Sequence, residues 1–311
     1  MNRRDLLGSS LGFAAAALPG KLFGQTLERI PAAATPIEGD ALLFLAQSEG
    51  YFARAGLQLD VQTMTSGEAT AAAIIGGDIA IGSMNTMSLA VAHQNGTALV
   101  AIGGGPMYES SHLGSQFMVA KTSAIASGAD LNGKTVAVNV LRGSAQLASQ
   151  AWIDKHGGDS KTVQWVEMPF SLMQAALESG RINAALITQP FATTAQATCR
   201  SLGSPNDAIA SRFLNGVYVT TSTWVAAHRS AAARVREALN KAAHWYNTDP
   251  AASVGAVATL TKQDPAVVAR SVRTLFGEEV TPALLQPVID LGARYGILKR
   301  SFPAAEIIAQ V

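Results

Sequence analysis

The chain has 311 residues, of which 48% are hydrophobic and only 14% are charged. This length and composition allow two modest hydrophobic cores, so we expect two lobes. The formal net charge is +1 and no block of lysine or arginine interrupts the chain, which argues against a nucleic-acid partner. The single cysteine, Cys199, excludes an intramolecular disulfide framework and a cysteine-rich metal site.

The first residues have the composition of an export signal. Arg3 and Arg4 precede an apolar stretch, residues 6–18, which is too short to span a bilayer. We interpret residues 1–25 as a signal of the twin-arginine type, with an ordinary secretory signal as the alternative. We therefore expect a periplasmic protein whose signal is removed and which has no stable membrane insertion.

The part of the chain that follows alternates helical and strand patterns, which is typical of an α/β fold. We predict a helix over residues 41–47 that stops near Gly50, a strand over 57–64, a helix over 68–75 ended by Gly76 and Gly77, and a buried strand over 79–83. The three glycines in "AIGGGPM" predict a hinge or a loop that approaches another part of the backbone closely.

The same order returns further along the chain. We predict a strand over 134–140, a helix over 144–156, a strand over 162–168, a helix over 171–179 that ends at Gly180, and a strand over 182–187. Gly77 and Gly180 each stand where a helix must turn left-handed before entering a parallel strand. We interpret this as two copies of one architecture; a common connection found twice by chance is the alternative. From residue 230 onward the chain is helical.

A ligand site is expected where the loops at the carboxyl ends of parallel strands converge. Six polar loops qualify, at residues 35–40, 65–68 and 83–86 in the first lobe and at 140–145, 169–172 and 188–191 in the second. The candidate ligand-binding residues are Glu38, Gly39, Asp40, Ser66, Gly67, Glu68, Ser83, Asn85, Thr86, Tyr108, Arg142, Gly143, Ser144, Phe170, Thr188, Gln189 and Phe191.

These loops contain charges of both signs. Arg142, followed by a glycine, a serine and the start of a helix, suits a carboxylate, sulfonate or phosphate oxygen. A solvated surface arginine and a simple serine N-cap are the alternatives. Glu38, Asp40 and Glu68 favour the opposite charge and could hold an amine. Methionines and phenylalanines nearby predict apolar walls, with core packing as the alternative for each methionine.

The sequence contains no catalytic or metal motif. The five histidines lack the spacing to glutamate of a zinc-binding helix, and no serine stands in a nucleophile elbow. We therefore expect neither a cofactor nor a metal, and a protein that is not an enzyme.

Four segments in a fixed order resemble the substrate-binding proteins of ABC transporters for nitrate, sulfonates and taurine, with their thiamine-precursor relatives. They are residues 46–61, 76–83, 130–144 and 177–191. The resemblance implies a two-lobed periplasmic binding protein fold of type II, in which each lobe is a mostly parallel sheet flanked by helices. Lobe I would comprise residues 27–112 plus 222–311 and lobe II residues 113–221, with crossings near 111–117 and 214–221.

The resemblance also implies what the protein does. A small organic solute, anionic and sulfonate- or carboxylate-like, would be trapped between the lobes of a monomer and passed to an ABC permease and its ATPase. Gln189 stands where relatives often have a glutamate, so the ligand cannot be copied from them. The alternatives are a solute sensor and an enzyme like the thiamine-pyrimidine synthases, whose cysteine-rich motif is missing here.

Overall fold

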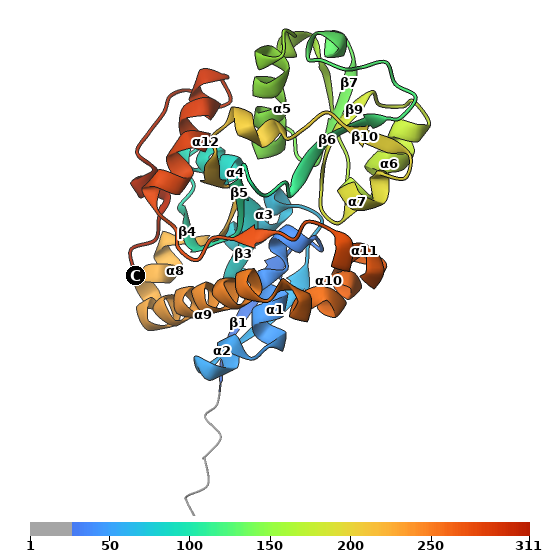
Figure 1. Cartoon of the computed structure of the whole chain (residues 1–311). Helices are drawn as coiled ribbons and strands as arrows, with labels where there is room; N and C mark the ends of the chain where they lie inside the picture. Colours follow the sequence, from blue (N-terminus) through green and yellow to red (C-terminus); the bar gives the residue numbers. More distant parts are fainter. Residues whose placement is uncertain (1–26) are drawn as a thin grey trace, which may run out of the picture.

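The computed structural model describes residues 27–311, so the expected export signal at residues 1–25 lies outside the described residues. The described chain forms two lobes, one above the other in Figure 1, with a five-stranded sheet in each. None of the helices within residues 27–311 is both long enough and apolar enough to cross a membrane. The predicted α/β two-lobed architecture is therefore confirmed.

The first lobe combines strands from both ends of the chain. Its sheet consists of β1 (Glu28–Ala34), β2 (Leu57–Thr63), β3 (Ile81–Asn85), β4 (Leu99–Gly104) and β12 (Gly216–Thr221). Its helices are α1 (Leu42–Ser48), α2 (Tyr51–Arg54), α3 (Gly67–Gly76), α4 (Thr86–Gln94), α8 (Ser222–Ala227), α9 (Arg229–Thr248), α10 (Val254–Thr261), α11 (Pro265–Arg270) and α12 (Pro282–Arg294). The sequence pattern did not predict β1.

The second lobe is one continuous piece of chain. Its sheet consists of β6 (Ser115–Ala120), β7 (Thr135–Val138), β8 (Gln164–Glu167), β9 (Ala184–Thr188) and β10 (Cys199–Ser201). Its helices are α5 (Ser144–Lys155), α6 (Phe170–Glu178) and α7 (Phe191–Ala195). A third, small sheet between the lobes consists of β5 (Pro106–Glu109), β11 (Arg212–Leu214) and β13 (Leu275–Phe276).

The two large sheets share one plan. The strand order is β2-β1-β3-β12-β4 in the first and, counted from the corresponding edge, β8-β7-β9-β6-β10 in the second. Within each, three parallel strands are followed by one antiparallel strand, β12 or β6. The helix that precedes the third strand ends at Gly77 (φ +88°) in one lobe and is followed by Gly180 (φ +69°) in the other. The predicted duplication, with its left-handed glycines, is confirmed.

The chain passes between the lobes twice, and one boundary differs from the expectation. The first crossing connects β5 to β6 through residues 110–114; the sequence placed it near residues 111–117. The second lies before β11, not at residues 214–221, because β12 pairs with β3 and β4 of the first sheet. Residues 216–221 therefore belong to lobe I. The sequence could not reveal this, since an antiparallel strand that returns to an earlier sheet has no local signature.

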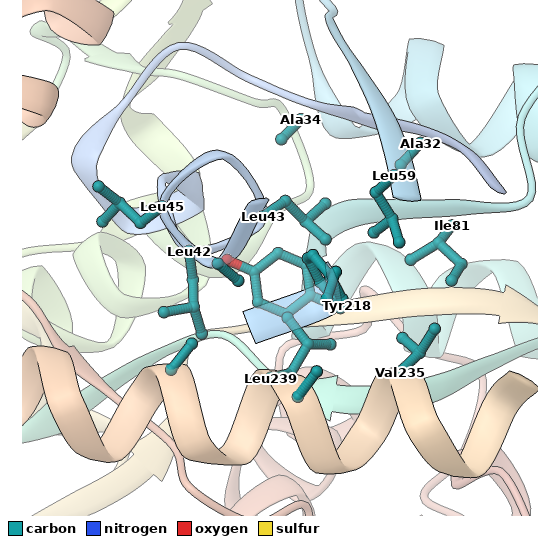
Figure 2. Packing of buried hydrophobic residues seen from close by; sticks show 14 of the residues in the cluster. Ala32, Ala34, Leu42, Leu43, Leu45, Leu59, Ile81, Tyr218, Val235 and Leu239 are labelled. Atoms are coloured by element: carbon teal, nitrogen blue, oxygen red, sulfur yellow. The ribbon is translucent and has the colours of Figure 1, made fainter. Parts of the chain in front are cut away.

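Hydrophobic residues cover both faces of each sheet. On one face of the first sheet, Tyr218 of β12 is buried between Leu42 and Leu43 of α1 and Leu239 of α9 (Figure 2). The cluster on the opposite face contains Leu147 and Ala151 of α5, a helix of the second lobe. Helix α5 therefore belongs to the cores of both lobes, which restricts how the lobes can move relative to one another.

The glycine run after β4 allows close backbone contact, as predicted. A Cβ atom on Gly104 would lie 2.3 Å from the carbonyl oxygen of Gly277, and one on Gly105 would lie 2.8 Å from the backbone of Gly216. Real Cβ atoms do not approach so closely, so only glycine fits here. This tight packing fixes the edge of the first sheet beside the small third sheet, next to the first crossing.

Candidate functional site

A cleft of about 660 Å³ lies between the lobes. The carboxyl ends of β1, β2, β3, β7, β8 and β9, with the loops or helix starts that follow them, all contribute residues to it, as the convergence of parallel strand ends predicts. Further residues come from the crossings and the small third sheet. The lining includes Thr35, Asp40, Thr63, Ser66, Asn85, Tyr108, His112, Ser115, Asn139, Ser144, Glu167, Phe170, Ser171, Thr188, Phe191, Asn206, Asn215 and Thr274.

Two carboxylates line the cleft, one from each lobe. Burial raises the pKa of Asp40 to about 7, although Thr35 donates a hydrogen bond to this carboxyl group. Glu167, at the end of β8, accepts a hydrogen bond of 2.9 Å from the backbone N–H of Leu141. Within residues 27–311, the cleft lining contains no lysine or arginine. The charged side chains of the cleft are therefore acidic.

His112 and Tyr108 are the other titratable groups of the lining, and both are held by hydrogen bonds. His112 Nε2 lies 2.6 Å from the backbone oxygen of Arg273. A carbonyl oxygen can only accept, so Nε2 carries a proton and donates this hydrogen bond. The Tyr108 hydroxyl donates to Asp207 at 2.7 Å, and burial raises the pKa of Tyr108 to about 12. Tyr108 is therefore neutral and anchored.

Apolar side chains form much of the wall. Phe170 and Phe191, at the starts of α6 and α7, have ring centroids 6.4 Å apart and planes inclined by 24°. Methionine side chains and an isoleucine add flexible surface, and the apolar lining includes Ile37, Met64, Met84, Met107, Val140, Met168, Leu186 and Leu275. Such a wall suits an organic body rather than a bare inorganic ion.

Ten of the candidate residues line the cleft. They are Gly39, Asp40, Ser66, Gly67, Asn85, Tyr108, Ser144, Phe170, Thr188 and Phe191. Several have structural roles as well. Ser66 caps α3 through the N–H of Ala69, and the Asn85 side-chain oxygen accepts from the N–H groups of Ser88 and Ser144. Asn85 therefore joins the amino end of α4 in one lobe to that of α5 in the other.

Arg142 does not line the cleft, which corrects the expectation of an anion partner. Its backbone is left-handed (φ +61°), and its Nη2 donates to the backbone oxygen of Ile297 at 2.8 Å. This exposed contact joins the loop after β7 to the segment that follows α12. Gly143, the next residue, is the N-cap of α5 and is also absent from the lining.

Glu38 is completely buried behind the cleft. It forms an ion pair with Arg273 at 2.5 Å and accepts a hydrogen bond from Tyr246. Arg273 also donates to Tyr246, to Ser253 and to a backbone oxygen. The neighbouring Asp40 lines the cleft, so this ion pair holds the loop that presents Asp40 but contributes no charge to the cavity.

Four more candidate residues do not belong to the cleft lining. Glu68 is exposed on α3, where it accepts from Ser88. Ser83 and Thr86 are buried, and Thr86 donates to the backbone oxygen of Leu214 at 2.6 Å. The Gln189 side-chain oxygen accepts from both the N–H and the hydroxyl of Thr193, near the start of α7. Local capping and core packing account for Glu68, Thr86 and Gln189, whereas the buried Ser83 lies beside Asp40 and partly offsets the rise that burial causes in its pKa.

The structure adds lining residues that sequence reasoning missed. Asn139 and Glu167 follow the same strand-end rule as the candidates and could have been included. His112, Asn206, Asn215 and Thr274 come from the crossings and from segments beside the third sheet, which no local pattern marks. The Oδ1 atom of Asn215 is buried and has no hydrogen-bond partner in the structure. Asn215 lines the cleft, but this oxygen atom itself is closed to solvent.

Metal-binding clusters and activated nucleophiles are two arrangements of side chains that support catalysis. Within residues 27–311, no group of three His, Cys, Asp or Glu side chains could hold a metal ion. In the same part of the chain, no serine or cysteine side chain is hydrogen-bonded to a histidine. Cys199 is buried at the start of β10, outside the cleft lining, and burial raises its pKa. A thiol in this environment is a poor nucleophile.

Comparison with known proteins identifies relatives by family and by fold. A family model described as NMT1/THI5 like matches residues 40–253, more than half of the chain. A search of curated proteins finds no match. Among solved structures, the alkanesulfonate-binding protein SsuA of Xanthomonas axonopodis pv. citri bound to MOPS has a TM-score of 0.76 and 19% identity, covering 91% of this chain and 98% of that one.

Two other similar structures differ in activity. The periplasmic nitrate-binding protein NrtA of Synechocystis PCC 6803 has a TM-score of 0.73 and 14% identity, over 91% of this chain and 86% of that one. A mutant of the desulfurization enzyme DszB in complex with biphenyl-2-sulfinic acid has a TM-score of 0.66 and 16% identity, over 91% of this chain and 96% of that one. The periplasmic binding protein fold therefore includes both binding proteins and an enzyme.

Proposed function

The chain belongs to the NMT1/THI5-like family, and from this premise we propose that it is a solute-binding protein of an ABC importer. It captures a small organic solute in the cleft between its lobes, and closure of the lobes around the solute is the signal that the permease recognises. SsuA and NrtA, which share the fold, are binding proteins. The proposal extends their type of activity, but not their ligands, to this chain.

The observation that carries the proposal is the composition of the cleft. One cavity of about 660 Å³ receives residues from the carboxyl ends of three parallel strands in each lobe. A solute there contacts both lobes at once, so its binding energy favours the closed arrangement over the open one. Hinged closure around a ligand is the motion expected of such a fold.

The location and partners follow from the same proposal. We propose that the protein works in the periplasm after removal of an export signal at residues 1–25, and that a permease and an ATPase are its partners. We further propose that it acts as a monomer. A sensor that reports to a receptor uses the same cleft and the same closure, so it is the alternative for the step after capture.

An enzymatic function is the second candidate, because the desulfurization enzyme DszB has the same fold. The side chains of the cleft favour binding over catalysis. Glu167 and His112 have no hydroxyl or thiol nucleophile among their hydrogen-bond partners, and the thiol of Cys199 is buried elsewhere. We therefore propose that the solute leaves the cleft chemically unchanged.

Equilibrium dialysis against a mixture of water-soluble metabolites tests the function. The wild-type protein is expected to enrich one compound or a small group, recovered unchanged by mass spectrometry. Ser171→Trp places a large ring in the cleft from an exposed position on α6 and is expected to abolish the enrichment. Leu172→Trp is the matched control, because Leu172 is the exposed neighbour of Ser171 on α6 and does not line the cleft. Chemical conversion of the enriched compound favours the enzyme; no enrichment refutes the proposal.

A further inference from the structure

We infer that the cleft selects a small organic cation, a protonated amine joined to a flat apolar body. This inference rests on the proposed solute-binding function and names the substrate class of the same site. It departs from the anionic solute expected from the sequence, because Arg142, the basic residue on which that expectation depended, donates to Ile297 and does not line the cleft.

The charges of the cleft all have one sign. Asp40 comes from the loop after β1 in lobe I, and Glu167 from the end of β8 in lobe II. The described lining offers no lysine or arginine to balance them. Arg273, the nearest arginine in sequence to the lining residues Thr274 and Leu275, is engaged behind the cleft with Glu38, Tyr246 and Ser253. An anion would therefore meet carboxylates and no permanent side-chain counter-charge.

The amino end of α4 is another source of positive charge beside the cleft, and its donors are already used. The first three N–H groups of α4 donate to the backbone oxygen of Asn215, to Ser144 Oγ and to Asn85 Oδ1. The N–H of Ser144, at the start of α5, also donates to Asn85 Oδ1, at 3.3 Å. Because neighbouring residues already satisfy these donors, an anion gains little from the amino end of α4 or from the N–H of Ser144.

The acceptors of the cleft match the donors of an ammonium group. The carboxylates of Asp40 and Glu167 accept, and because His112 Nε2 donates to a backbone oxygen, Nδ1 accepts wherever the ring is neutral. An ammonium has three N–H donors and no acceptor, so it can donate to a carboxylate and to Nδ1 together. An oxyanion only accepts, so it offers these atoms no hydrogen bond.

The aromatic side chains of the cleft wall favour a ligand with a flat apolar body. The stacked pair Phe170 and Phe191 stands at the start of two helices of lobe II, with Tyr108 on the lobe I side of the crossing. Aromatic faces attract cations as well as flat rings. Methionines such as Met64 and Met168 adapt to the shape of the body. The cleft therefore combines an acidic polar part with an aromatic wall.

The two carboxylates also couple capture to closure. Asp40 and Glu167 belong to different lobes but line one cavity, so a cation held between them is attracted to both walls. The ligand therefore binds the closed form better than the open one, which is the condition for driving a conformational change.

A series of naphthalenes that share one body tests the charge preference. The probes are 2-naphthylmethylamine, 2-naphthalenemethanol, 2-naphthoate and 2-naphthalenesulfonate, measured at pH 8 by calorimetry and by thermal shift on wild type, Asp40→Asn, Glu167→Gln and Asp78→Asn. Asp78 is exposed, lies in lobe I and does not line the cleft, so its variant is the matched control. The ammonium probe is expected to bind at least tenfold more tightly than the alcohol, with weaker binding still for both anions.

The variants locate the effect. Asp40→Asn and Glu167→Gln are each expected to weaken the ammonium probe about tenfold or more, while Asp78→Asn leaves it unchanged. Tighter binding of naphthoate or naphthalenesulfonate than of the ammonium overturns the inference but leaves the solute-binding function standing. Equal affinity for amine and alcohol also overturns it. If none of the four probes binds and the dialysis experiment enriches an anionic compound, the cation preference is refuted but the solute-binding function stands. If none of the four probes binds and the dialysis experiment enriches nothing, the solute-binding function is refuted as well.

Discussion

Replacing Asp40 by asparagine tests the origin of its elevated pKa. Burial raises this pKa from its ordinary value of 3.8 to about 7, so the folded protein bears the free-energy cost of a poorly solvated carboxylate at neutral pH. A shift of about three pKa units corresponds to about 4 kcal/mol at 1.36 kcal/mol per unit. Asp40 is only half-buried, and solvent screening reduces our expectation to about 2 kcal/mol. The ligand-free Asp40→Asn protein should therefore be more stable than wild type at pH 8.

The pH dependence distinguishes this explanation from a general effect of the substitution. Because the folded-state pKa is raised, the cost of the carboxylate is absent below about pH 4, grows as the pH rises toward 7, and is constant above it. The buried hydroxyl of Tyr218, whose pKa burial raises well above 10, stays neutral over this range. Urea denaturation of wild type, Asp40→Asn and the Asp78→Asn control at pH 4, 5.5, 7 and 8 measures the difference. A stability gain that is equal at pH 4 and pH 8, or a loss at pH 8, refutes the reasoning.

Three further predictions use the same preparations. Arg273→Met leaves the buried Glu38 carboxylate unpaired and should lower the free energy of unfolding by about 3–5 kcal/mol; urea denaturation measures this loss, and a loss below about 1 kcal/mol contradicts it. Arg142→Ala removes an exposed contact with Ile297, so it should cost less than about 1 kcal/mol and leave the affinity for every naphthalene probe within about twofold; a large loss of anion binding contradicts this placement. The affinity for 2-naphthylmethylamine should rise about tenfold or more from pH 5.5 to pH 8 as Asp40 ionises, and calorimetry should find a much smaller rise in Asp40→Asn.

Local signals in the sequence predicted the repeated architecture but not the way its two copies are joined. Gly77 and Gly180 revealed equivalent helix ends, because a left-handed turn restricts the residue type at one position. Residues 216–221 belong to lobe I because they pair with β3 and β4, which are more than a hundred residues away in the chain, so no local pattern could assign them to a lobe. Strand β1, "ERIPAAA", has a proline and small residues instead of an alternating pattern, so its buried position beside β2 and β3 was not visible.

The site residues at strand ends could be predicted from local sequence, and those that depend on distant contacts could not. The strand-end rule located Asp40, Ser66, Phe170 and Phe191 in the cleft, because the carboxyl ends of parallel strands share one edge of a sheet. The rule cannot say which way a long side chain turns. Arg142 stands in one of the correct loops, yet its left-handed backbone and the carbonyl of Ile297 direct its guanidinium out of the cavity. Residues of the crossings, such as His112, could be found only from the tertiary structure.

Strand β12 is synthesised after every strand of the second lobe, which has a consequence for the order in which the lobes fold. This strand lies between β3 and β4, so a nascent chain that ends before residue 216 holds the first sheet in two separate parts. The other lobe is contiguous, and all five of its strands have been synthesised by residue 201. Contacts between distant segments form slowly, and the lobe that contains the amino-terminal strands is therefore the one that folds last. During biosynthesis its unpaired edges remain open to chaperones and to aggregation until the chain has returned.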